Sequence, residues 1–264
     1  MNTLYLSKRT SVNKIKRMIK KNRLDALVIS KYLKKDEEYM KDIKKLNIPI
    51  SDGRWLFKFL IIYILEYIAK CQKRKKRDLK IAFMCNYNSS IISYFIKEII
   101  SNVKNLKIIT NVRRKFEKLE KDLLEECGSV LIITNSRRKA LENIDIVINF
   151  DFSSKQINEF NLNNRMIIIN LKDKIEINSK RFDGININYY EIDFNNKAIM
   201  IYEWIKDYNL TEIYESYLFQ KNNIDNIINI IKKDKVSIKY LIGNNGKINE
   251  KEYMKLLDKR YKLD

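Results

Sequence analysis

The stretch from Asp78 to Asp151 constrains the fold of this chain most strongly. Four short β-branched runs, KIAFM, LKIIT, VLIIT and DIVINF, alternate in it with segments of helical hydrophobic spacing. This alternation is typical of parallel βαβ units rather than of a helical bundle or a β-sandwich. Two further runs, MIIINLK and GININYYEI, continue the pattern. The sequence therefore predicts an α/β fold with a Rossmann-like, mostly parallel sheet.

The segments around this stretch predict a chain of three parts. Residues 1–77 read as a small α/β region plus a long apolar helix over residues 54–72, followed by the basic run KRKKRD at 73–78 as a linker. Residues 78–196 form the predicted Rossmann-like domain. In residues 197–264 the apolar spacing predicts a helical C-terminal region, with a turn at 243–247 that connects two helices.

The amino-acid composition indicates a globular protein with no membrane-spanning segment. Hydrophobic residues make up 45% of the 264 residues and charged residues 33%, as in soluble globular proteins. The longest apolar run, residues 55–69, is interrupted by Lys58 and Glu66. It is also shorter than the ~20 residues of a transmembrane helix, so no membrane span is expected. The N-terminus lacks the apolar core of a signal peptide, which predicts a cytoplasmic protein.

The formal net charge of +20 points to an anionic partner, such as a small anionic ligand, a nucleotide or a nucleic acid. A codon bias toward Lys, Asn and Ile explains the same excess of positive charge without any selection for binding. Only local basic clusters therefore count as indications of a site. The basic run at 73–78 is interpreted as a helix end and solvated connection, with a nucleic-acid patch as the alternative.

The sequence contains no histidine, which removes the commonest metal ligand and the usual general base near neutral pH. Its three cysteines, Cys71, Cys85 and Cys127, have no metal-ligand spacing. No metal site is therefore expected. Cys85 lies at the end of a predicted strand, and we interpret it as a small buried hydrophobe rather than a nucleophile.

A candidate ligand site follows the first strand of the predicted domain. In dinucleotide-binding folds this turn carries glycines, so that backbone amides approach the pyrophosphate. Here the turn reads NYNSS, and Asn86, Asn88 and Ser89 are the candidates for binding an anion. Asp151, after the fourth strand, is predicted to cap the next helix, with a position facing the ligand crevice as the alternative.

An internal echo marks the second and third strands. Residues 108–115 read IITNVRRK and residues 132–139 read IITNSRRK. Both basic clusters are expected at the carboxyl edge of the sheet, where doubly wound folds bind ligands. A cation at a helix N-terminus lies beside the positive end of the helix dipole and destabilises the helix by ~0.3–1 kcal/mol. A bound anion would offset this cost. The candidates for binding a phosphate-type ligand are Arg113, Arg114, Arg137 and Arg138. The alternative is two similar βα units in a Lys-rich chain.

Residues 50–151 resemble the shikimate dehydrogenase group and its glutamyl-tRNA reductase relatives. The segment ISDGRWLFKFL at 50–60 is similar to the family's T-D-G-x-G-like helix start. IITNVRRKFEKL is similar to its strand leading into N-R-T, and DIVINFD to its D-x-V-I-N-A-T segment. The family's glycine-rich turn is replaced by NYNSS, and its N-V-T-x-P-x-K-like motif with the catalytic Lys is not found in residues 1–50.

The resemblance implies a Rossmann-like domain that takes NADP or NAD. It implies that Asn111, Arg113 and Arg114 bind the adenosine-side phosphate and that Asp52 contacts substrate. The first hypothesis is therefore an NAD(P)- or nucleotide-binding protein related to oxidoreductases, with catalysis left open because no catalytic motif is found. The alternatives are a non-catalytic interaction or regulatory module on a degenerate Rossmann fold, and a basic nucleic-acid-binding protein. The sequence names neither a substrate nor a protein partner.

Overall fold

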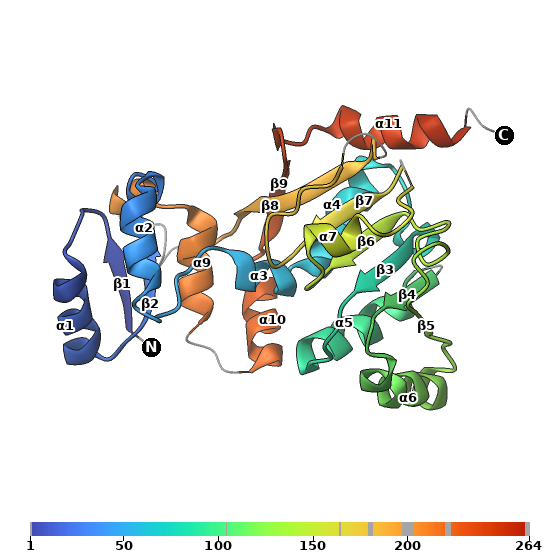
Figure 1. Ribbon diagram of the computed structural model, residues 1–264, viewed down its shortest axis with the longest axis horizontal. Helices are drawn as coiled ribbons and strands as arrows, with labels where there is room; N and C mark the ends of the chain where they lie inside the picture. The colour runs from blue at the N-terminus through green and yellow to red at the C-terminus, as the bar shows by residue number, and fades with distance from the viewer. Residues whose placement is uncertain are drawn as a thin grey trace. The chain divides into compact units, whose positions relative to one another are not determined.

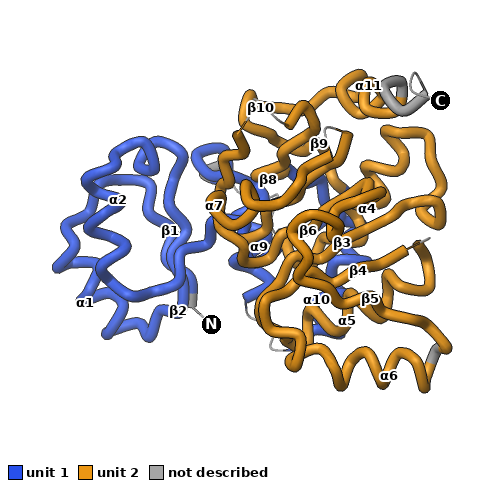
Figure 2. The backbone as a smooth tube through the Cα atoms, turned by 45° about the vertical axis from the view of Figure 1, so that its right-hand side comes forward, with its two compact units in different colours: residues 1–56, 191–237 blue, residues 57–190, 238–264 orange. Residues whose placement is uncertain are grey.

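The computed structural model describes residues 2–103, 105–163, 165–178, 182–196, 203–219 and 223–261. The chain forms two compact units (Figure 2). Unit 1 comprises residues 1–56 and 191–237, and unit 2 comprises residues 57–190 and 238–264. Because each unit is assembled from two separate segments, the predicted boundaries at 77/78 and 196/197 lie inside unit 2 and unit 1, respectively.

Unit 2 is built on the predicted sheet (Figure 1). Its strands lie in the order β10-β9-β8-β7-β6-β3-β4-β5, and every neighbouring pair from β8 to β5 is parallel. The order in which the chain visits the strands reverses between β3 and β6, as in doubly wound folds. This confirms the predicted α/β class. The strands are β3 (Lys80–Met84), β4 (Asn105–Ile109), β5 (Ile132–Thr134), β6 (Ile146–Asn149), β7 (Ile167–Asn170) and β8 (Ile185–Asp193).

The central strands are buried along their length. All four residues of β6 and of β7 are buried, as are the last four of β3. A parallel strand covered on both faces reads as a continuous apolar run, which explains IVI and III in these strands. Each fully buried aliphatic side chain contributes ~1.5–3 kcal/mol, so these strands anchor the unit.

Helices connect and flank these strands (Figure 1). The predicted helix over 54–72 is interrupted at Leu60, which gives two helices. Gly128, at a φ of 61°, ends the helix after β4, because glycine adopts this left-handed conformation without strain. The helices are α3 (Arg54–Phe59), α4 (Ile61–Cys71), α5 (Ser90–Ile100), α6 (Glu117–Cys127), α7 (Ser154–Ile157) and α11 (Glu250–Tyr261), with 3-10 turns η2 (Lys76–Asp78) and η3 (Arg113–Lys115).

The prediction of a purely helical C-terminal region is wrong. Residues Ser237–Gly243 form strand β9, which pairs antiparallel with β10 (Gly246–Lys247). Exposed Ser237 and Lys239 alternate with buried Ile238, a strand pattern that the neighbouring helical periodicity obscured. Asn244 and Asn245 link the strands, and Gly246 has a φ of 100°, so the glycine turn makes a hairpin and not a helix–helix connection. The first part of the predicted region, 197–202, lies outside the described residues.

Unit 1 carries a separate two-stranded parallel sheet of β1 (Asn2–Leu6) and β2 (Leu24–Ile29). Ser11 caps α1, and Asp36 caps α2. A hydrophobic cluster that includes Leu6, Ile15 and Leu27 joins the strands to these helices. The other elements are α1 (Val12–Asn22), η1 (Leu33–Lys35), α2 (Glu37–Lys44), η4 (Glu203–Asp207), α9 (Leu210–Leu218) and α10 (Ile224–Lys233).

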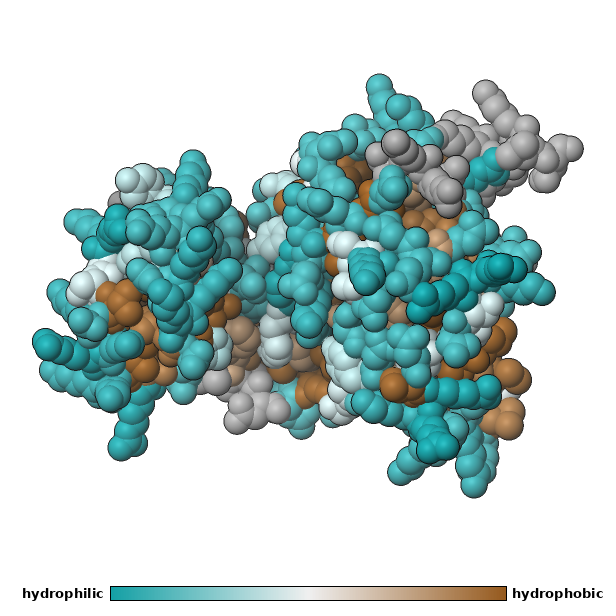
Figure 3. Space-filling view, in the orientation of Figure 1, coloured by the Kyte–Doolittle hydropathy of each residue, from teal (hydrophilic) through white to brown (hydrophobic). Residues whose placement is uncertain are grey.

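The visible surface is mostly hydrophilic, with hydrophobic atoms gathered where α6 and β5 lie in unit 2 (Figure 3). Leu124, Val130 and Ile132 are exposed there, and β5 is an edge strand of the sheet. Within the described part of the chain, every helix is too short or too polar to cross a bilayer.

Candidate functional site

The reversal of strand order brings three strand ends of unit 2 together around Asn86. The backbone N–H of Asn86, after β3, donates to both carboxylate oxygens of Asp151, after β6, at 3.0 and 3.1 Å. The Asn86 Oδ1 accepts the backbone N–H of Asn111, after β4, at 2.9 Å. The structure therefore places two predicted site residues, Asn86 and Asn111, in direct contact. With Lys115 and Lys172 these residues form what we call the switch-point cluster.

Asp151 faces this cluster and does not cap the following helix. Ser153 caps α7 instead, in a capping box with Gln156. Partial burial of the Asp151 carboxyl raises its pKa, and the bonds from Asn86 together with the charges of Lys172 and Lys115 offset part of that rise. The predicted capping role is wrong because a serine two residues later has the better position for it. The cluster thus contains one half-buried acid beside two exposed cations.

The side chains of the turn after β3 are bonded to the protein itself. The Asn88 amide donates to the carbonyl of Lys115 at 3.3 Å and accepts the Ser93 hydroxyl at 2.9 Å. The Ser89 hydroxyl accepts the N–H of Ile92 and so caps α5. The Asn88 side chain therefore joins the turn after β3 to the turn after β4. Glycine has no side chain and could not make this connection.

The two echo segments lie side by side, since β4 and β5 are neighbours. The third residue of each is a threonine whose hydroxyl accepts the N–H two residues later, at 3.1 Å from Val112 and at 3.1 Å from Ser136. The repeat is therefore a repeat of local structure as well as of sequence. The same hydroxyl bond after each strand explains why Thr110 and Thr134 recur at the same place.

The predicted arginines differ in their surroundings. The Arg113 guanidinium lies 3.8 Å from the Glu120 carboxylate, and the Arg137 guanidinium forms an ion pair with Glu159. Arg114 and Arg138 are exposed. Two of the four predicted cations are therefore balanced by acids of the same unit, which lowers the positive charge that they offer to a ligand. The assignment of these arginines to a ligand stays a prediction.

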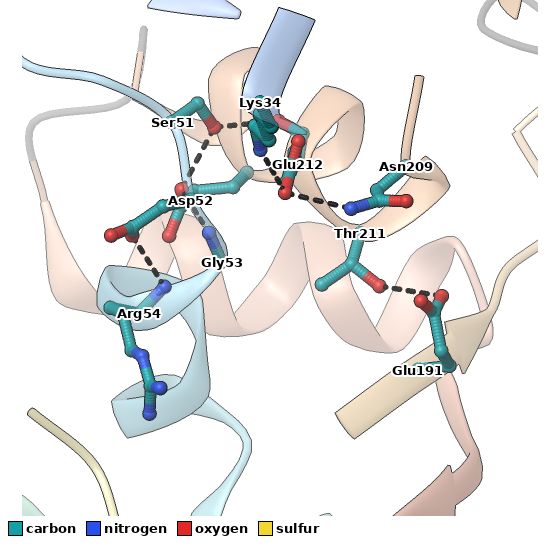
Figure 4. A network of polar contacts seen from close by, with 10 residues as sticks. Lys34, Ser51, Asp52, Gly53, Arg54, Glu191, Asn209, Thr211 and Glu212 are labelled. Carbon is teal, nitrogen blue, oxygen red and sulfur yellow. Dashed lines mark hydrogen bonds and ion pairs between the residues drawn. The ribbon is translucent and has the colours of Figure 1, made fainter. Parts of the chain in front are cut away.

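A second polar cluster lies in unit 1, around the turn of Ser51, Asp52 and Gly53 (Figure 4). The carboxylate oxygen Oδ1 of Asp52 accepts the N–H of Arg54, the first residue of α3, at 3.0 Å. Asp52 is exposed, and its carboxylate points toward Arg54. Its contact with substrate stays a prediction. Gly53 has a φ of 81°, the left-handed conformation that glycine adopts without strain.

Glu215, from α9, holds this turn from inside unit 1. Its Oε2 accepts the N–H of Gly53 at 2.8 Å and contacts the Ser51 hydroxyl at 2.8 Å. Its Oε1 accepts the N–H of Leu56 at 2.9 Å. The side chain is completely buried, and burial raises the pKa of its carboxyl. Local sequence patterns do not reveal Glu215, because only the fold brings it to a turn more than 150 residues away.

Lys34 is a further residue that sequence reasoning did not select. Its ammonium forms an ion pair with the buried Glu212, whose Oε1 also accepts the Asn209 amide at 2.9 Å (Figure 4). No local pattern in the sequence reveals this pair, because Lys34 and Glu212 lie far apart in the chain.

A ladder of asparagines crosses the sheet of unit 2, and the sequence analysis missed it as well. Amide-to-amide bonds run from Asn149 to Asn170 at 3.1 Å, from Asn170 to Asn188 at 3.0 Å and from Asn188 to Asn244 at 2.7 Å. Asn186 joins it through Asn170 at 2.7 Å. Buried polar groups normally form hydrogen bonds. The amides of this ladder bond to one another, because the isoleucine side chains of the core cannot form hydrogen bonds.

The ladder ends beside a pocket of about 200 Å³. Apolar side chains and polar groups both line this pocket, which lies between the start of β8 and the β9–β10 hairpin. Its lining includes Ile177, Phe182, Asn186, Asn244, Lys247 and Glu252. In the part of the chain that the structure describes, no group of three or more acidic, cysteine or histidine side chains is arranged to hold a metal ion.

Cys85 is expected to be inert toward alkylation in the folded protein. It is fully buried, and burial raises the pKa of its thiol, so the reactive thiolate is scarce. Reaction requires local opening, and an opening free energy of ~3 kcal/mol slows it about 100-fold relative to the unfolded chain. Iodoacetamide labelling followed by peptide mass spectrometry, with the denatured protein as control, measures this. Equal rates in both states would identify Cys85 as an activated thiol.

Comparison with family models and with curated proteins found no match. Among solved structures, L-tryptophan dehydrogenase from Nostoc punctiforme is similar at 12% identity and a TM-score of 0.35, over 84% of this chain and 64% of that one. Ornithine carbamoyltransferase from Pyrococcus furiosus is similar at 11% identity and a TM-score of 0.31, over 62% and 58%. Aspartate transcarbamoylase from Trypanosoma cruzi, solved with N-(phosphonacetyl)-L-aspartic acid, is similar at 11% identity and a TM-score of 0.27, over 65% and 59%. This chain therefore spans less than two thirds of each of these three proteins.

Proposed function

We propose that the protein binds a nucleotide or similar phosphorylated anion at the switch-point cluster, as an NAD(P)-binding protein related to the shikimate dehydrogenase group. The strand order of unit 2 is the observation that supports this most. Doubly wound sheets bind ligands at the carboxyl ends of their strands, where the order reverses, and here that point lies between β3 and β6.

The charges of the switch-point cluster also favour an anion. Lys115 and Lys172 are exposed, and both stabilise the negative charge of Asp151. The N-terminus of α5 begins at the same turn and contributes the positive end of its dipole. Asp151 opposes an anionic ligand when it is ionised. Because its pKa is raised, a ligand that binds beside it is expected to bind more tightly as the pH falls through that pKa.

Isothermal titration calorimetry with NADPH, NADH, ADP and inorganic phosphate tests this proposal. Replacing Lys115→Gln removes a cation from the cluster, and we expect about tenfold weaker binding, equivalent to ~1.4 kcal/mol. Replacing Asp151→Asn removes the opposing charge while Oδ1 still accepts the Asn86 N–H, and we expect several-fold tighter binding. A matched control is Lys251→Gln, an exposed lysine on α11, which should leave affinity unchanged.

The alternative is an interaction or regulatory module that no longer takes a nucleotide. The bonds of the Asn86 and Asn88 side chains support it, because these groups join the first turn to the second where glycines would leave room for a diphosphate. Binding of none of the four probes at millimolar concentration would favour this alternative. Equal effects of Lys115→Gln and Lys251→Gln would instead indicate attraction by net charge alone.

For hydride transfer, a bound cofactor would supply the chemistry and the chain would position the substrate. The resemblance implies that Asp52 contacts substrate, and Lys34 of the same unit pairs with the buried Glu212. We propose these two side chains of unit 1 as the first positions to replace in a screen for NADP-dependent turnover.

A further inference from the structure

The Ser51 hydroxyl lies between two oxygen atoms of α9. It is 2.6 Å from the backbone carbonyl oxygen of Glu212 and 2.8 Å from Oε2 of Glu215. A hydroxyl carries a single hydrogen, and a backbone carbonyl can only accept. The hydrogen of Ser51 therefore belongs to the shorter contact, with Glu212.

The contact between Ser51 and Glu215 then needs a hydrogen of its own. An ionised carboxylate would face a lone pair of the hydroxyl across 2.8 Å, which is repulsive. If the hydroxyl turned toward Glu215 instead, the contact of 2.6 Å with Glu212 would join two oxygens with no hydrogen between them. Both distances lie in the range of O–H···O bonds, and a proton on the Glu215 carboxyl gives each of the two contacts a hydrogen of its own.

We propose that Glu215 is an uncharged carboxylic acid in the folded protein at neutral pH, and that its proton closes a pH-sensitive latch on the turn of Ser51, Asp52 and Gly53. In this latch Oε2–H donates to Ser51, and Ser51 donates to the Glu212 carbonyl. The other lone pairs of Glu215 accept the N–H groups of Gly53 and Leu56, at 2.8 and 2.9 Å. Every polar atom of the latch is then satisfied.

The surroundings of Glu215 favour its neutral form. The side chain is completely buried, and this burial raises the pKa of its carboxyl. The bonds with Leu56, Gly53 and Ser51 offset part of that rise, and the negative charge of Asp52 adds to it. Arg54, at the start of α3, is joined to Asp52 through its backbone N–H. Lys34, from η1, pairs with the Glu212 side chain rather than with Glu215. From α9 itself, Tyr214 bonds to Asp234.

The direction of the pH effect follows from the raised pKa. The folded protein holds a proton that the unfolded chain releases above the ordinary glutamate pKa of ~4.3. The contribution of Glu215 is fully present at low pH and is lost as the pH rises toward its folded value. In that window the unfolding equilibrium constant rises about tenfold for each pH unit. Since the chain has no histidine, few other side chains titrate there.

Urea unfolding of the full chain between pH 5 and 8 tests the latch. The comparison uses the native protein, Glu215→Gln and the control Glu38→Gln, an exposed glutamate of α2. We expect the native protein and the control to lose stability as the pH rises. In Glu215→Gln the rise of the unfolding equilibrium constant should be smaller by about tenfold per pH unit. Asp151→Asn separates the contribution of the other carboxyl whose pKa is raised. The same slope in the native protein and in Glu215→Gln would overturn the proposal.

If Glu215→Gln does not fold, carbon NMR of the native protein tests the latch instead. In the native protein labelled with ¹³C at glutamate Cδ, one resonance is expected at the position of a protonated carboxyl at pH 7, apart from the ionised glutamates. A spectrum in which all glutamates titrate together near pH 4–5 would contradict the latch.

Discussion

Replacing Asn170→Leu is expected to lower the free energy of unfolding by about 3–5 kcal/mol. Asn170 is fully buried and bonds to Asn149, Asn186 and Asn188. Leucine has a similar volume but cannot bond, so buried donors and acceptors on three neighbours lose their partner at ~1–3 kcal/mol each, with partial rearrangement. Urea unfolding followed by circular dichroism measures the loss.

The matched control is Asn245→Leu, an exposed asparagine in the β9–β10 hairpin. We expect a change within about 0.5 kcal/mol for this variant. If Asn170→Leu were as stable as the native protein, the ladder would be a by-product of an Asn-rich composition and not a support of the sheet.

The second large effect is expected at Arg74, inside the basic run KRKKR. Its Nη2 lies 3.0 Å from Oδ2 of Asp145 and donates to the carbonyl of Asp78 at 2.9 Å. The two side chains of the pair are 20% and 9% exposed. Replacing Arg74→Met leaves Asp145 charged and largely buried without its cation. We expect a loss of about 3 kcal/mol in the free energy of unfolding.

Lys76→Met is the control from the same run. The Lys76–Glu66 pair is about half exposed on both sides, and such pairs contribute ~0–1 kcal/mol. Equal losses for Arg74→Met and Lys76→Met would contradict a structural role for Arg74. A clear difference would show that the run is not a uniform solvated patch.

Local patterns predicted most of unit 2 correctly. The apolar runs of β3, β4, β6 and β7 are short and β-branched and are bounded by turn residues, so their periodicity is unambiguous. Strand β9 was missed because SIKYLIG lies among amphipathic helices and also fits a helical period. The three-part division assumed contiguous segments, whereas each unit combines two distant pieces of chain.

The candidate site was predictable only where it depends on strand ends. Asn86 and Asn111 follow neighbouring strands, so the parallel fold alone brings them together. Glu215 and Glu212 lie on a helix far from Ser51 and Lys34 in sequence, and no local pattern reveals contacts of that range. The prediction that Asp151 caps a helix was wrong because capping rules consider only the nearest helix. Its actual partner is the backbone N–H of Asn86, 65 residues away.

Amide chemical shifts measured during a titration with NADPH and, separately, with ADP test the proposed ligand site most directly. We predict that the largest shifts occur at Asn86, Asn111, Lys115 and Asp151, which surround the point where the strand order reverses. Saturable shifts confined to other parts of unit 2, such as the pocket beside the β9–β10 hairpin, or no shifts at millimolar ligand, would contradict it.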